Sequence, residues 1–246
     1  MLSKIQLFAL FGLLSAAFAP ATADQTSSVF LIGHSLVNHN MPTMLEALVQ
    51  DAGLSYSGGR QIINGANLQW QWNNSHTANA QARTYIYETW HCINSGLPAG
   101  CDWDDNDNIP WRERLDQDLS AWQGIADHLN VEFAGPEVSL IPAGQAMALL
   151  YDRALAGEVP GIGHAFDLFS DDIHLTDAGN YFVALVMFAT IFQQSPEGLT
   201  AQISNEWDAP YDLPNAVTAL ALQALAWEAV QNYLGLADAI FTSRFE

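Results

Sequence analysis

The chain has 246 residues, half of which are hydrophobic, and its formal net charge at pH 7 is −20. This apolar content excludes an intrinsically disordered protein, and so acidic a surface should repel DNA, RNA and anionic lipid. The length suits one α/β domain with a sizeable core. We therefore expect a folded protein that binds neither nucleic acid nor membranes. Solubility is the favoured explanation of the acidic surface, and a preference for neutral over acidic substrates is the alternative.

Residues 1–23 have the pattern of a secretory signal peptide. Lys4 provides a positive charge, residues 5–19 are apolar, and Ala21-Thr22-Ala23 forms a cleavage site of small residues. An N-terminal membrane anchor is the alternative, but this apolar stretch is short for a membrane span. We expect a secreted or periplasmic protein whose mature part, residues 24–246, is a single domain.

The apolar pattern of the mature part predicts strands that alternate with helices. In chain order, we expect a strand over 29–32, a helix over 42–52, a strand ending at 63, a strand over 84–89, a helix over 111–130, a strand over 138–141, a helix over 143–156, a helix capped by Thr176 that runs to 192, and a helix within 213–234. This alternation is typical of an α/β fold with a parallel sheet that helices cover on both faces.

Ser35 stands just after the first predicted strand, where open α/β sheets place their functional residues. Gly33 ends that strand and lets the chain turn. The helix that follows has free N–H groups at its N-terminus, and these favour a developing negative charge. Ser35 is thus well placed to act as a nucleophile, provided that a base reaches it.

A candidate base lies in the predicted loop before the helix capped by Thr176. Asp171 and His174 are three residues apart, so the carboxylate can hold the imidazole in one tautomer and stabilise its cation. Asp172 is the alternative orienting group, but we expect it to point away or to cap the helix. A serine hydroxyl needs such an oriented base to react near neutral pH.

Both blocks resemble the GDSL, or SGNH, serine hydrolases. The first block of that family is similar to Gly33-His34-Ser35-Leu36, and residues 171–174 fall in its last block. The resemblance implies a flavodoxin-like three-layer α/β/α sandwich with a parallel sheet, and ester hydrolysis without a metal or other cofactor. It implies that Ser35 is the nucleophile, His174 the base and Asp171 its orienting group.

Two further stretches, residues 35–42 and 141–145, resemble a secreted bacterial branch of the same family. The chain departs from the family at His34, where Asp or Asn is usual. We expect His34 to be a local hydrogen-bonding replacement rather than a second catalytic base.

The oxyanion hole is the larger departure from the family. The resemblance calls for N–H groups from the serine and a glycine, for which Gly65 is the candidate, and for an Asn side chain in a Gly-x-Asn-Asp block. That block is absent from the sequence. Between the strand ending at 63 and the strand starting at 84, the chain is short for a further strand and its crossover. The alternative Asn donors are Asn64, Asn67, Asn73, Asn74 and Asn94.

Cysteines, acidic residues and histidines form three further patterns. In an exported protein, Cys92 and Cys101 are expected to form a disulfide that pins the loop between them, and two free thiols are the alternative. Residues 102–113 resemble a calcium loop but lack the glycine that it requires, so we expect a solvated acidic loop. The histidines show no His-x-x-x-His spacing, so no catalytic metal is expected.

Tryptophans crowd the middle third of the chain, and packing is the favoured explanation because aromatic side chains bury a large area. Stacking on sugar rings is the alternative, which the polar segment 68–74 fits better than it fits a core. These tryptophans are Trp70, Trp72, Trp90, Trp103 and Trp111.

The sequence predicts a secreted serine esterase with a Ser35, His174 and Asp171 triad. The expected substrate is a small-molecule or carbohydrate ester with a short acyl group such as acetyl. The alternative is a non-catalytic or weakly active carbohydrate-binding protein on a degenerate hydrolase scaffold, because the family's asparagine block is missing.

Overall fold

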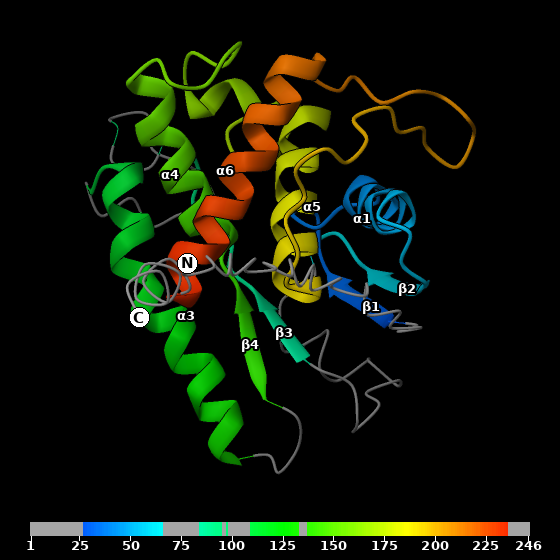
Figure 1. Ribbon diagram of the computed structural model, residues 1–246. Coiled ribbons are helices and arrows are strands. Elements are labelled where there is room, and N and C mark those ends of the chain that lie inside the picture. The colour runs from blue at the N-terminus through cyan, green and yellow to red at the C-terminus, as the bar shows by residue number, and fades with distance from the viewer. Residues whose placement is uncertain (1–26, 66–83, 95–96, 98–108, 133–136, 236–246) are drawn as a thin grey trace, which may run out of the picture.

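The computed structural model describes residues 27–65, 84–94, 97, 109–132 and 137–235 (Figure 1). The described part is a mixed α/β fold in which parallel strand pairs accompany five α-helices. The predicted signal peptide, residues 1–23, lies outside it. None of the described helices combines the length and the apolar composition that a membrane span requires.

The first unit is a strand–helix–strand crossover. Its elements are strand β1 (Ser27–Gly33), helix α1 (Asn40–Asp51) and strand β2 (Tyr56–Ile62). The two strands are parallel and in register, with Gly33 opposite Ile62. The structure confirms the predicted strand and helix, although α1 begins two residues before Pro42. It begins early because the Asn38 side-chain oxygen accepts hydrogen bonds from the N–H groups of Asn40 and Met41.

A second parallel pair follows, with a helix between its strands. Its elements are strand β3 (Thr84–Tyr87), helix α3 (Trp111–Glu132) and strand β4 (Val138–Ile141). The predicted strand over 138–141 is confirmed at both ends. Strand β3 is shorter than the predicted 84–89 and ends at Tyr87, just before Glu88, whose carboxylate contacts the N-terminus of the helix that follows β4.

The C-terminal half of the described chain is helical. Its elements are helix α4 (Ala143–Leu155), the short 3-10 helix η1 (Ala165–Leu168), helix α5 (Asp177–Phe192) and helix α6 (Ala216–Leu234). The Thr176 hydroxyl accepts a hydrogen bond from the Gly179 N–H at 3.2 Å, so the predicted cap is confirmed. Helix α6 begins at Ala216, where the Asn215 side chain caps it, and lies within the predicted 213–234.

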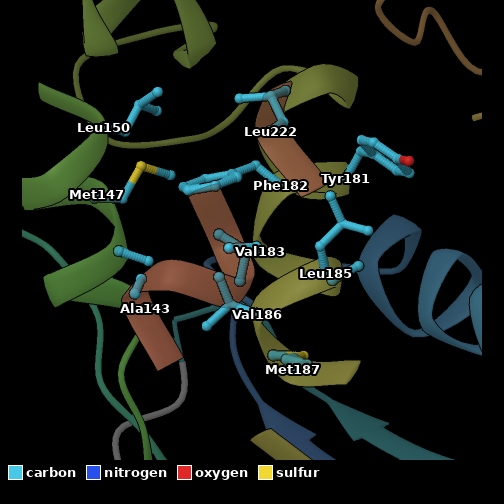
Figure 2. Packing of buried hydrophobic residues seen from close by; sticks show 14 of the residues in the cluster. Ala143, Met147, Leu150, Tyr181, Phe182, Val183, Leu185, Val186, Met187 and Leu222 are labelled. Atoms are coloured by element: carbon cyan, nitrogen blue, oxygen red, sulfur yellow. The ribbon is translucent and has the colours of Figure 1, made fainter. Parts of the chain in front are cut away.

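Helix α5 is the centre of the core. Every residue from Gly179 to Thr190 is buried, since the helix is apolar on all sides. Figure 1 shows α5 between α1 and α6, and it packs against both and against α4. In Figure 2, the ring of Phe182 points toward Met147 of α4, with Leu222 of α6 beside it. The rest of the chain is therefore arranged around one buried helix.

The mixed α/β class and the parallel pairing of the strands are confirmed. Within the described residues, the strands form two separate pairs, β1 with β2 and β3 with β4. A single sheet that helices cover on both faces, as in a flavodoxin-like three-layer sandwich, stays a prediction.

Glu88 joins the second strand pair to helix α4. Its N–H donates to the Ile141 carbonyl at 3.1 Å, and its carboxylate lies at the N-terminus of α4. There, Glu88 Oε2 accepts from the Gln145 N–H at 3.3 Å and Oε1 from Gln145 Nε2 at 2.9 Å. The side chain is 1% exposed. Burial raises the pKa of Glu88 to about 7, while the hydrogen bonds from Gln145 and Gly144 act in the opposite direction.

We expect Glu88→Gln to remove part of the pH dependence of stability. The folded-state pKa of Glu88 is above its unfolded value, so the folded protein binds the proton more tightly and loses stability as pH rises from about 4.5 to about 7. A shift of this size corresponds to roughly 2–4 kcal/mol. Urea unfolding of both proteins at pH 4.5 and pH 8 measures it. Parallel pH profiles of the two proteins would contradict the assignment.

Candidate active site

Ser35 lies in the turn formed by residues 34–39, between β1 and α1, and is partly exposed. The turn is tight, because the N–H groups of Val37 and Asn38 both donate to the His34 carbonyl. Gly33 is required here for space rather than for a left-handed backbone, since a Cβ at this position would lie 2.9 Å from Val37 Cβ. The turn therefore holds Ser35 directly at the carboxyl end of β1.

His34 stabilises the turn from inside. Its Nδ1 accepts a hydrogen bond from the Leu36 N–H at 3.4 Å. Burial, and then the nearby His174 ring, lower the pKa of His34, which favours the neutral ring that can accept this bond. The predicted local hydrogen-bonding role of His34 is thus confirmed.

Asp171 and His174 form the predicted pair. His174 Nδ1 lies 2.8 Å from Asp171 Oδ2. The other carboxylate oxygen, Oδ1, accepts from the N–H groups of Ile173 at 2.9 Å and His174 at 2.6 Å. The carboxylate is therefore fixed by three contacts, and it leaves Nε2 of His174 available on the opposite edge of the ring.

The hydrogen bonds of Asp171 favour its ionised form. Partial burial acts to raise the pKa of Asp171, but the N–H groups of His174 and Ile173 and the His174 ring together hold it below its usual value. Asp171 therefore stays a carboxylate throughout the neutral range. A permanent negative charge beside Nδ1 stabilises an imidazolium when His174 accepts a proton.

Asp172 points away from His174, as expected. Its Oδ2 lies 3.4 Å from the buried Cys92 Sγ, and its carbonyl accepts from the Ile93 N–H at 2.7 Å. Trp90 Nε1 donates to the Ile173 carbonyl at 2.9 Å. The segment from Trp90 to Ile93 thus supports the loop that carries the Asp171–His174 pair.

The structure brings the loop that carries Ser35 next to the segment that follows His174. Asn38 Nδ2 donates to Asn180 Oδ1 at 2.7 Å, and Asn40 Nδ2 donates to Asp177 Oδ1 at 3.2 Å. Asn180 is 2% exposed, so the first of these bonds is shielded from water. No hydrogen bond joins the Ser35 hydroxyl to His174 in the described part of the chain.

We expect Asn38→Ala to destabilise the protein by about 2 kcal/mol and to slow any reaction of Ser35. The change removes the two hydrogen bonds that Asn38 Oδ1 accepts from the N–H groups at the start of α1 and the bond to Asn180, and it places alanine at a φ of +44°. Asn38→Gly is the matched variant, since it tolerates this φ but loses the same bonds. Urea unfolding of both variants separates the two contributions. Wild-type stability of both variants would rule out a structural role for the Asn38 side chain.

The predicted oxyanion donors are only partly described. Gly65 lies in an exposed turn after β2, with a φ of +73°. Because β1 and β2 are parallel neighbours, Gly65 and Ser35 follow the same edge of the pair. Asn64 is exposed, and Asn94 follows the segment that is hydrogen-bonded to the Asp172 carbonyl. The other asparagine candidates, Asn67, Asn73 and Asn74, lie outside the described residues.

The two described tryptophans of the middle third belong to the core. Trp90 is 4% and Trp111 is 3% exposed, and both rings pack edge-to-face on Phe169. Packing is therefore confirmed for these two. The others, Trp70, Trp72 and Trp103, and the polar segment 68–74 lie outside the described residues.

The remaining predictions fall partly outside the described chain. Cys101 is not among the described residues, so its bridge to Cys92 stays a prediction. The same holds for most of the acidic loop over 102–113. Among the described residues, no three His, Cys, Asp or Glu side chains gather closely enough to hold a metal ion.

Sequence reasoning missed the two asparagines that join the loops. Asn38 and Asn180 each carried a signal, because an asparagine just before a helix is a common cap and a polar side chain in an apolar helix needs a partner. Neither signal shows that Asn38 and Asn180 are hydrogen-bonded to each other.

No family model matches the chain, and neither a curated protein nor a solved structure is significantly similar to it.

Proposed function

We propose that this protein is a serine esterase of the SGNH type, with Ser35 as nucleophile, His174 as base and Asp171 as its orienting group. The observation that carries the proposal is the Asp171–His174 pair, in which one carboxylate oxygen contacts Nδ1 at 2.8 Å and the other accepts two backbone N–H groups. An imidazole held in this way has its second nitrogen free to accept a proton.

The joined loops support Ser35 as the group that delivers this proton. Asn38 and Asn40, from the turn and helix that follow Ser35, are hydrogen-bonded to the first turn of α5, which begins three residues after His174. Catalytic hydrogen bonds are often long in the absence of substrate and shorten in the complex. The lack of a Ser35–His174 hydrogen bond is compatible with this role.

The proposed reaction proceeds through an acyl-enzyme. Ser35 Oγ attacks the ester carbonyl while His174 Nε2 takes its proton, and the N–H groups of Ser35 and Gly65 stabilise the oxyanion. The protonated His174 then gives its proton to the leaving alcohol. Water, activated by the same nitrogen, hydrolyses the acyl group from Ser35 and restores the free enzyme.

The proposal includes the family fold and the extracellular setting. Two parallel strand pairs with helical connections support a flavodoxin-like three-layer sandwich. The signal-like residues 1–23 support export, and export in turn supports a disulfide between Cys92 and Cys101. The net charge of −20 favours a neutral substrate, for which we propose a short acyl ester of a carbohydrate.

Fluorophosphonate labelling tests the proposal directly. We expect a single adduct on the mature protein, located on the peptide that contains Ser35, and no adduct on Ser35→Ala or His174→Ala. Ser120→Ala is the matched control, because Ser120 is exposed on α3 and should not react. An adduct on another serine, or unchanged labelling of His174→Ala, would refute the triad.

A non-catalytic carbohydrate-binding protein is the second candidate. The absent Gly-x-Asn-Asp block and the absence of a Ser35–His174 hydrogen bond in the described chain favour it. This candidate predicts that the wild-type protein gives no adduct and yet binds glycans. A Ser35 adduct that turns over would exclude it.

A further inference from the structure

Trp207 is the aromatic residue among the exposed large hydrophobic residues of the described chain, with 77% of its surface accessible. It lies between α5 and α6, in the segment drawn in gold and orange in Figure 1. An aromatic ring with this exposure is available to stack on a ligand. Trp207 lies outside the tryptophan-rich middle third of the chain.

The loop that presents Trp207 is well ordered by hydrogen bonds. Asn205 Oδ1 accepts from the N–H groups of Trp207 and Ala209, both at 3.0 Å. The Asn205 N–H donates to the Ala209 carbonyl at 2.9 Å, and Ser204 pairs with Pro210 in an antiparallel bridge. The backbone that carries Trp207 is therefore held in a closed turn, so little backbone entropy is lost when the indole contacts a ligand.

The same loop is tied to the first strand pair. Glu206 Oε2 lies 3.3 Å from Arg60 Nη2, and the other guanidinium nitrogen of Arg60 donates to the His39 carbonyl at 3.3 Å. Since His39 ends the turn that contains Ser35, this contact links the loop with the exposed indole to the loop with the proposed nucleophile.

A cleft of about 300 Å³ lies between the N-terminal part of α1, strand β2 and the loop, and its lining includes Asn205 and Glu206, the two residues that precede Trp207 in the chain. Its polar lining offers hydroxyl, amide, carboxylate and guanidinium groups. These come from Thr43, Glu46, Tyr56, Arg60, Asn205 and Glu206. Such groups are hydrogen-bond partners for the hydroxyl groups of a sugar.

The charge of the cleft restricts the kind of sugar. Glu46 and Glu206 are acidic, and the only cation of the lining, Arg60, is already paired with Glu206. Anionic sugars would therefore meet net repulsion. In a neutral polysaccharide, one sugar unit can place its apolar face on the exposed indole while a neighbouring unit places its hydroxyl groups on the polar lining.

We propose that Trp207 and this cleft form a binding subsite for a neutral polysaccharide chain. The subsite would hold the carbohydrate part of the substrate, and in that respect it rests on the proposed function. The glycan contacts themselves require no catalysis, so binding and turnover can be tested separately.

Affinity electrophoresis of the Ser35→Ala protein tests the subsite without turnover. The gels contain arabinoxylan, mixed-linkage β-glucan, galactomannan or dextran, with polygalacturonate as the anionic control. We expect retardation on at least one neutral polysaccharide, none on polygalacturonate, and about tenfold weaker binding after Trp207→Ala is added. Trp207→Phe should retain part of the binding.

Val131→Ala is the matched control, because Val131 is 82% exposed at the end of α3, an element that contributes no residue to the cleft. It should leave the retardation unchanged. No retardation on any neutral polysaccharide, or retardation that survives Trp207→Ala, overturns the subsite. Binding of phosphatidylcholine vesicles through Trp207, without glycan binding, overturns it too. None of these results bears on fluorophosphonate labelling of Ser35, which tests the esterase separately.

Discussion

Replacing Asp171 by asparagine is expected to lower ester turnover by roughly 10³- to 10⁴-fold. Asp171 Oδ1 accepts two backbone N–H groups, so the amide oxygen of the asparagine must take that place. The amide NH₂ then faces His174 Nδ1 and donates to it. This bond holds the ring with its proton on Nε2, where it cannot accept the serine proton.

The measurement is kcat for a small acetyl ester, with the labelling rate as a second readout. Asp172→Asn is the matched control, because it makes the same chemical change one residue along, in a side chain that lies beside Cys92 rather than His174. We expect it to change kcat by less than about threefold. Equal losses in the two variants would mean that Asp171 does not orient the base.

The second large effect is expected from Gly179→Ala, in the first turn of α5. A Cβ at position 179 would collide with the Leu168 carbonyl oxygen and would lie 2.9 Å from Leu175 Cβ. The same Leu168 carbonyl accepts from the N–H and the hydroxyl of Thr176, so these residues cannot move apart without breaking the helix cap. We expect a loss of about 3 kcal/mol in unfolding free energy, and a displaced His174.

Gly124→Ala is the matched change in another helix. Gly124 lies on the exposed side of α3, and a Cβ there would meet nothing within 4 Å. Alanine is the better helix former, so this variant should gain about 0.5–1 kcal/mol. Urea unfolding of both variants should therefore give opposite signs. Destabilisation of similar size in both would show that the contact with Leu168 is not the cause.

The positions of the helices and strands could largely be predicted because each follows a local pattern. The apolar run within α5, the Thr176 cap and the residues of β4 are visible in short windows of sequence. The predicted first and last residues of helices and strands were less accurate where a side chain distant in sequence lies at the end of the element. Strand β3 ends two residues before the predicted 89, where the Glu88 carboxylate contacts the N-terminus of α4, and the sequence contains no local sign of that contact.

In the candidate site, too, short-range contacts could be predicted from the sequence and long-range contacts could not. The Asp171–His174 contact spans three residues, so spacing alone predicted it. The contact of Asn38 with Asn180 spans 142 residues, and no single-sequence pattern reveals it. Trp207 was missed for a related reason, since exposure depends on the fold of the α5–α6 segment and not on the neighbouring residues.

The central place of α5 has a consequence for the order in which the molecule can form. The β1–α1–β2 unit buries its apolar face on a helix that begins at Asp177, more than a hundred residues later in the chain. A nascent chain therefore exposes α1 until α5 has been made, which is after more than three-quarters of the protein, and contacts over such separations form slowly. Late folding would suit the export that we propose, because the chain would stay unfolded for longer during synthesis. The proposed nucleophile and its base meet only in that last step, so reactivity toward a fluorophosphonate should appear together with global folding.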